Sequence, residues 1–74
     1  MITEQYETIR KTLEFYKDKN KSIHLNLMSK TWLNGKIVSI GDNSFVLDEE
    51  RLGEMLIRFD RIKEDGIEPR EEKR

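Results

Sequence analysis

The chain contains no cysteine and a single histidine, His24. Disulfide bonds are therefore excluded, and a zinc site built from several cysteines and histidines of one chain is excluded as well. A domain as short as 74 residues buries only about 60% of the surface that its unfolded chain exposes. Small domains without covalent or metal staples often depend on oligomerisation or on very good packing. The sequence therefore favours a single domain that assembles into an oligomer.

The chain also lacks an excess of one charge and lacks long apolar runs. Its 14 Lys and Arg residues face 15 Asp and Glu residues, for a net charge of −1. Duplex-binding domains are typically strongly basic, so that class is disfavoured, while a local basic rim on an oligomer stays open. No stretch approaches the ~20 apolar residues of a membrane helix, and no apolar signal-type run opens the chain. We therefore expect a soluble, cytoplasmic protein without a membrane partner.

Apolar residues recur along the first part of the chain at steps of four, three, four and three: Ile2, Tyr6, Ile9, Leu13 and Tyr16. This spacing places them on one face of a helix. Thr3 is a suitable N-cap, and Asn20 can adopt the left-handed conformation that ends a helix. The pattern predicts a helix over about residues 3–18.

After the helix the apolar period changes to two, which is typical of half-buried strands. Alternation and turn residues together predict five short strands, at about residues 23–28, 31–40, 44–47, 54–59 and 61–63. Gly35, inside the second strand, indicates a sharp bend or a bulge. The chain beyond residue 64 is charged and has little to bury, which predicts a frayed end.

These elements predict a mainly β fold, with an N-terminal helix followed by a small, strongly bent, five-stranded antiparallel barrel. We expect the helix to pack on one open end of the barrel. The single domain is predicted to cover residues 1–65, with the barrel at about 22–64, and residues 66–74 are predicted to form a charged, flexible tail.

Two stretches resemble the motifs of the Sm-like (LSm/Hfq-like) family. Residues 33–47 contain a strand with a glycine, an apolar residue two positions later, a turn and an apolar strand: LNGKIVSIGDNSFVL. Residues 56–62, LIRFDRI, are similar to the second motif, in which two apolar residues precede Arg-Gly, a polar pair and an apolar residue. The resemblance covers roughly residues 23–63, and the preceding helix fits the family's N-terminal helix. It implies an Sm-like (SH3-like) barrel and a cyclic homo-oligomer that binds single-stranded RNA at or near its pore.

The resemblance also implies which residues contact RNA. In the family, the turn after the second strand reads a base, and this turn corresponds to Asp42 and Asn43. The arginine of the second motif lines the pore, and it corresponds to Arg58. Phe59 stands where the family has a glycine, and its ring is a candidate to stack on a base. Asn43 occupies the position of an aromatic residue in Hfq. No cofactor, metal or small-molecule substrate is expected.

Each of these residues also has a structural interpretation. Arg58 could form an ion pair with Asp60 or Asp42 instead of contacting RNA. Asp42 and Asn43 are ordinary turn residues, because their side chains hydrogen-bond the local backbone. Phe59 could equally fill an interface.

Two further side chains on the strands invite a functional interpretation. Trp32 lies on the opposite strand face from Leu33, and it could stack on a base, although packing under the helix or at a subunit contact is favoured. His24 has no ligating or nucleophilic neighbour at a useful spacing, so an exposed or hydrogen-bonded strand histidine is expected.

Two functions therefore stay open on the sequence alone. The first is an Sm-like ring that binds single-stranded RNA, and the alternative is an assembly or protein-interaction module without base-specific RNA binding. An enzyme is disfavoured, because no nucleophile–base pair, metal set or phosphate loop is visible. Charges are segregated, with a net +4 over residues 17–36 and a net −4 over residues 42–54. In a ring, repetition of the lysine-rich block would give a positive rim.

Overall fold

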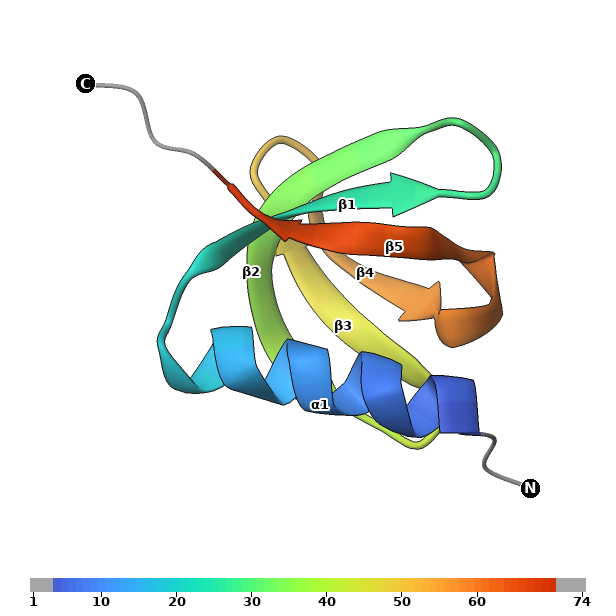
Figure 1. Ribbon diagram of the computed structural model, residues 1–74. Coiled ribbons are helices and arrows are strands. Elements are labelled where there is room, and N and C mark those ends of the chain that lie inside the picture. The colour runs from blue at the N-terminus through green and yellow to red at the C-terminus, as the bar shows by residue number, and fades with distance from the viewer. Residues whose placement is uncertain (1–3, 71–74) are drawn as a thin grey trace.

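The computed structural model describes residues 4–70, so Ile2, Thr3 and residues 71–74 of the predicted tail lie outside it. Its elements are a helix, five strands and a short 3-10 turn (Figure 1). In chain order they are α1 (Glu4–Asp18), β1 (Ser22–Leu27), β2 (Trp32–Ile40), β3 (Ser44–Glu49), β4 (Gly53–Arg58), η1 (Phe59–Arg61) and β5 (Ile62–Pro69). The strands form an antiparallel sheet in the order β4-β3-β2-β1-β5. The predicted mainly β fold with an N-terminal helix is confirmed.

Helix α1 forms where the apolar spacing predicts it and packs on the sheet through the predicted face. Leu13 is fully buried, and Tyr6, Ile9 and Tyr16 are half-buried against the same core. A helix of this length is marginal by itself in water. Burial of this face against the sheet therefore supplies the stability that the isolated segment lacks.

The helix ends in a left-handed cap, as predicted. Asn20 has a φ of 54°. Its N–H donates to the carbonyl oxygen of Lys17 at 2.9 Å, and the N–H of Lys21 donates to the carbonyl oxygen of Tyr16 at 3.0 Å. These two bonds form a Schellman cap, which satisfies carbonyl groups that the last helical turn leaves unpaired. The chain can then reverse direction into β1.

Apolar side chains from α1, η1 and all five strands meet in one core between the helix and the sheet: Leu13, Ile23, Leu25, Leu33, Ile37, Phe45, Leu47, Ile57, Phe59 and Ile62. The sheet that carries them is open. Its two edge strands are β4 and β5. The fold therefore presents one edge of β4 and one edge of β5 without a neighbouring strand in the described part of the chain.

Strand β2 curves strongly (Figure 1), and two features of its sequence allow this. Gly35 pairs with Glu49 of β3, and a Cβ atom at Gly35 would lie 2.8 Å from the carbonyl carbon of Asp48. Only a residue without a side chain permits so close an approach. The register with β3 then shifts between Ile37 and Ser39, which marks a β-bulge and increases the local twist.

Substitution of Gly35 by alanine should therefore destabilise the fold by about 1–3 kcal/mol, the usual cost of overpacking. Urea unfolding measures the change. Gly41→Ala is the matched control, because a Cβ atom there would approach the carbonyl oxygen of Ser44 no closer than 3.2 Å. Equal unfolding midpoints for the two variants would contradict this account of the bend.

Strand β5 is longer than predicted, because it extends to Pro69. The prediction of a flexible tail over residues 66–74 is therefore wrong for the part that lies in β5. The charged composition concealed two residues that fit the sheet. Ile67 pairs with β1 and packs against the core, and Gly66 is buried where a Cβ atom would lie 2.5 Å from a carbonyl oxygen of β1. The folded domain consequently extends past residue 65.

Candidate functional site

Three of the residues that the sequence singles out for RNA binding lie at one end of the sheet. Asp42 and Asn43 form the exposed turn between β2 and β3, and Arg58 ends β4. The sheet pairs Ser44 with Arg58, and the N–H of Phe59 donates to the carbonyl oxygen of Asn43 at 2.9 Å. Residues from two segments of the chain are thus held side by side and can act on one ligand.

Arg58 forms an ion pair with Asp60, with 3.1 Å between Nη2 and Oδ2. This is one of the two structural alternatives that the sequence left open. The Arg58 side chain is nevertheless 69% exposed and the Asp60 side chain 45% exposed. Ion pairs between exposed side chains contribute only about 0–1 kcal/mol. The guanidinium group can therefore exchange this carboxylate for another anion at little cost.

Asp42 binds a residue that the sequence did not bring into the site. Its Oδ1 atom lies 3.3 Å from Nη1 of Arg10 in α1. The side chains are 34% and 77% exposed for Arg10 and Asp42 respectively, so this pair is also open to solvent. The helix therefore contributes a second guanidinium group beside the β2–β3 turn. No local signal could have found it, because the two partners are far apart in the chain.

Phe59 does not present its ring to solvent, contrary to the prediction of a base-stacking residue. It is 1% exposed and packs edge-on against Tyr6 of α1, with 5.4 Å between ring centroids. The ring centroid of Phe45 in β3 lies 6.4 Å from that of Phe59. The ring is a core residue that joins the helix to the sheet. Strand alternation carried this signal, because Phe59 falls two residues after the buried Ile57.

Trp32 and His24 lie together on the outer face of the sheet. Trp32 is 52% exposed, so the interpretation that it packs under the helix is wrong. Its ring centroid lies 5.6 Å from that of His24. The Nδ1 atom of His24 hydrogen-bonds Oδ1 of Asn34 at 2.7 Å. His24 is thus the hydrogen-bonded strand histidine that the sequence predicts.

Glu49 is a buried carboxylate that the sequence did not single out. It is 5% exposed and accepts hydrogen bonds from the backbone N–H groups of Arg51 at 2.8 Å, Leu52 at 3.0 Å and Asn34 at 3.1 Å. These donors, above all Arg51 and then Asn34, hold the pKa of Glu49 below its ordinary value of 4.5. The ionised side chain therefore fixes the β3–β4 turn and ties it to β2.

Stability should consequently fall in acid through Glu49. Its pKa is depressed in the folded state, so its contribution is complete above the unfolded value of 4.5 and is lost as the pH falls through the folded pKa. Thermal melts from pH 7 to pH 3 measure this loss. The Glu49→Gln variant should melt lower at pH 7 and show a flatter pH profile, whereas Glu14→Gln, on the exposed face of α1, should follow the parent. Parallel profiles for the parent and Glu49→Gln would contradict this role.

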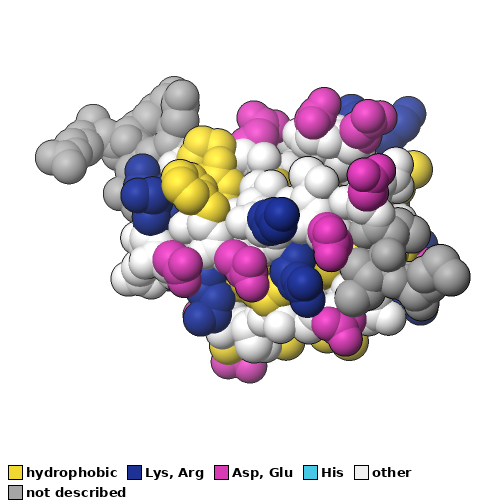
Figure 2. Space-filling model, turned by 60° about the horizontal axis from the view of Figure 1, so that its bottom comes forward, with side chains coloured by type: hydrophobic (Ala, Val, Ile, Leu, Met, Phe, Trp, Pro, Cys, Tyr) yellow, Lys and Arg dark blue, Asp and Glu magenta, His cyan; other side chains and the backbone are white. Residues whose placement is uncertain are grey.

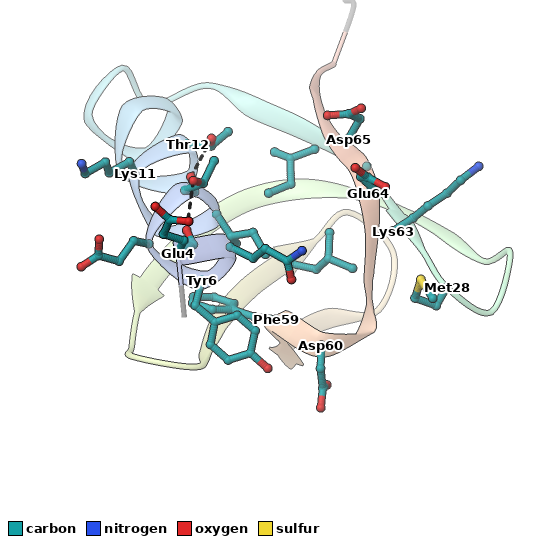
Figure 3. A pocket seen from close by; sticks show the side chains of 17 residues that line it. Glu4, Tyr6, Lys11, Thr12, Met28, Phe59, Asp60, Lys63, Glu64 and Asp65 are labelled. Carbon is teal, nitrogen blue, oxygen red and sulfur yellow. Dashed lines mark hydrogen bonds between the residues drawn. The ribbon is translucent and has the colours of Figure 1, made fainter. Parts of the chain in front are cut away.

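A groove of about 1170 Å³ runs between α1 and β5 (Figure 3). Its apolar lining comes from Tyr6, Ile9, Met28, Phe59, Ile62 and Ile67. Its charged lining is mainly acidic, with Glu4, Glu7, Asp60, Glu64 and Asp65 against Lys11 and Lys63. An excess of carboxylates repels phosphate groups, so the groove is unsuited to RNA. An apolar floor beside an edge strand suits an added strand of protein.

The face of the molecule that carries α1 shows acidic and basic side chains interspersed (Figure 2). The lysine-rich block of the sequence therefore does not produce a uniformly basic surface on this side. The candidate positively charged site for RNA is instead local. It consists of the guanidinium groups of Arg10 and Arg58 around the β2–β3 turn.

Within residues 4–70, no helix has the length and the apolar character that crossing a bilayer requires. In the same part of the chain, no group of three or more His, Cys, Asp or Glu side chains is placed to hold a metal ion. In comparisons with known proteins, no protein-family model and no curated protein matches the chain.

Proposed function

We propose that this chain is a subunit of an Sm-like homo-oligomeric ring that binds single-stranded RNA. The observation that carries the proposal is the open sheet, whose edges β4 and β5 have no further strand beside them within residues 4–70. Such edges expose unpaired N–H and C=O groups, which proteins must pair or cover. Addition of β4 from one copy to β5 of the next satisfies both edges, and a head-to-tail contact of this kind can close into a ring.

The groove along β5 supports this arrangement. It offers an apolar floor beside the strand to which β4 of another copy would be added. Met55 of β4 is half-buried against the core of its own subunit and Leu56 is exposed, so β4 carries apolar side chains on both of its faces. Edge pairing would bury part of this surface as well as satisfy the backbone. Burial of apolar surface and pairing of backbone groups both favour association over the isolated subunit.

Two arginines support the RNA component of the proposal. Arg10 and Arg58 flank the Asp42–Asn43 turn, and each is held by an exposed aspartate. A guanidinium group can bind a phosphate with two parallel hydrogen bonds and can stack on a base. The Asn43 side chain offers a donor and an acceptor to a base edge. In a ring, each subunit would repeat this set, so that a single strand could contact several copies.

We further propose that the protein acts in the cytoplasm and has no catalytic role. The absence of cysteine from the sequence fits a reducing compartment, and the candidate site contains arginine, aspartate and asparagine but no activated nucleophile.

A second candidate function is an assembly or protein-interaction module without base-specific RNA binding. Burial of Phe59 favours it, because the site then lacks an aromatic ring on which a base could stack. Neutralisation of each site arginine by an aspartate favours it as well. This second candidate retains assembly or a protein partner and lacks base-specific recognition, so RNA binding distinguishes the two.

Native mass spectrometry at tens of micromolar, with and without a short polyuridine or polyadenine strand, tests the proposal. We expect a single closed multiple of the 8.9 kDa subunit that gains RNA at near-physiological salt. Amide hydrogen exchange should show slow exchange in β4 and β5 at this concentration and faster exchange on dilution, with β2 as the control that is paired on both sides. A monomer would overturn the ring. A ring that fails to bind RNA even at low salt would leave the second candidate.

A further inference from the structure

An apolar stripe crosses the outer face of the sheet on strands β2, β3 and β4. It consists of Val38, Val46 and Leu56, and we refer to it as the outer stripe. The sheet pairs Val46 directly with Leu56 of β4 and with Ser39 of β2, and Val38 is the adjacent residue within the β2 bulge. Leu56 is 68% exposed and Val38 43% exposed. Two exposed apolar side chains, with the half-buried Val46 between their strands, thus lie on the outer face of the sheet.

The outward residues of β4 on either side of Leu56 carry unlike charges, and across the sheet the Glu54 row also contains Asp48 and Lys36. Arg58 lies two residues from Leu56 along β4, on the side of the β2–β3 turn, and is paired with Ser44 of β3. Glu54 lies two residues from Leu56 in the other direction and is paired with Asp48. Residues two apart on a strand point to the same face. Along β4, the outward side chains are therefore acidic, apolar and basic in turn: Glu54, Leu56 and Arg58.

This order is complementary to itself. We infer that the outer stripe is a contact surface for a second copy of this chain, related to the first by a two-fold axis along the stripe. The axis places Leu56 on Leu56 of the second copy and reverses the direction of β4. Arg58 of each copy then lies over Glu54 of the other, on both sides of the apolar row. Isologous contacts require this kind of self-complementarity, and sheets packed face to face lie about 10 Å apart with interleaved side chains.

The ion pair between Arg58 and Asp60 does not oppose the contact. Both side chains are exposed, so exchange of Asp60 for Glu54 of a second copy replaces one solvent-exposed pair with a less exposed one. The same guanidinium group is proposed to bind RNA, so the contact describes the RNA-free protein.

Other exposed apolar side chains do not form an equivalent surface. Phe15 on α1 is covered in part by Lys19, whose Nζ atom lies 5.1 Å from the ring centroid. Met28 and Leu52 lie outside the strands, in the β1–β2 and β3–β4 connections. Trp32 on β2 is 52% exposed, and its ring centroid lies 5.6 Å from that of the polar His24. The outer stripe combines apolar neighbours with flanking charges of opposite sign on the same strand.

The contact uses the face of β4 and leaves its edge free, so it adds to the proposed ring and does not replace it. In a ring it would stack two rings, and without a ring it would give a dimer. The masses differ, so failure of this inference can be told from failure of the ring.

Sedimentation equilibrium of the parent, Leu56→Glu and Leu52→Glu proteins tests the inference. The two leucines are equally exposed, at 68% each, and only Leu56 belongs to the outer stripe. We expect Leu56→Glu to halve the mass of the parent, from a double ring to a single ring or from a dimer to a monomer. Leu52→Glu should keep the parent mass. Equal masses for all three proteins, or an equal loss in both variants, would overturn the inference.

Charge reversal provides a second, independent readout. Glu54→Arg alone and Arg58→Glu alone should each weaken the contact at low salt, because each places like charges opposite one another. The double variant Glu54→Arg/Arg58→Glu should restore the parent mass, since the reversed pattern is again self-complementary. Failure of the double variant to recover, with an unchanged thermal melt, would also overturn the two-fold arrangement.

Discussion

Replacement of Leu13 by alanine should destabilise the protein by about 2–5 kcal/mol, the range for buried leucines. Leu13 is the fully buried residue of α1, and its side chain belongs to the core between the helix and the sheet. Removal of three side-chain carbons leaves a cavity that the short helix can close only by shifting as a whole. Small domains have a total stability of about 5–15 kcal/mol. A single truncation should therefore remove a large share of it.

Urea unfolding followed by far-ultraviolet circular dichroism measures this effect. Phe15→Ala is the matched control, because Phe15 lies on the same helix and is 54% exposed. We expect Phe15→Ala to remain within about 1 kcal/mol of the parent, as is usual for surface positions. Equal unfolding midpoints for Leu13→Ala and Phe15→Ala would show that α1 does not dock through the face described above.

If the proposed function holds, replacement of Arg58 by alanine should weaken the affinity of the proposed ring for single-stranded RNA by about 10- to 100-fold. Hydrogen bonds to charged groups contribute roughly 1.5–3 kcal/mol, and every subunit loses its guanidinium group at once. The slope of log affinity against log salt concentration should also become shallower, because fewer counterions are released. The ring itself should persist, since Arg58 makes only an exposed ion pair within its own subunit.

Lys36→Ala is the control for Arg58→Ala. Lys36 is an exposed cation on β2 away from the β2–β3 turn, so its loss should weaken binding only mildly and equally for all bases. Filter binding at several salt concentrations and a thermal melt on the same samples separate the possibilities. The opposite outcome is that Arg58→Ala lowers the melting temperature and leaves RNA affinity unchanged. In that case Arg58 stabilises the end of β4 through its ion pair with Asp60, and the second candidate function is favoured.

Patterns within short stretches of the sequence predict the helix, its end and the bend of the second strand. The spacing from Tyr6 to Tyr16 predicts α1 and the face that it buries, and Asn20 marks its end. Gly35 predicts the bend of β2. Each of these features has a signal within a few residues of the chain, although the contact that requires Gly35 is made with Asp48 of the next strand.

The contacts that join distant segments could not be predicted in the same way. Ile67 looks isolated among charges, and only its pairing with β1 shows that β5 continues. Arg10 meets Asp42 because the helix crosses the end of the sheet, a placement that no short window of sequence contains. The wrong prediction for Phe59 came from its position in the motif that resembles the Sm-like family. Strand alternation already placed its side chain on the buried face. The same alternation places Glu49 inward after Leu47, where a carboxylate needs backbone donors.

The open sheet has a genetic consequence, because its free edges belong to two different strands. In the proposed ring, a chain whose β5 cannot pair still presents an intact β4, so it joins an assembly and then blocks its closure. A chain that cannot fold does not join an assembly and only lowers the amount of competent subunit. One subunit of the first kind should therefore prevent closure of the whole assembly that it joins. Such variants should behave as dominant. Variants that only unfold the subunit should behave as recessive.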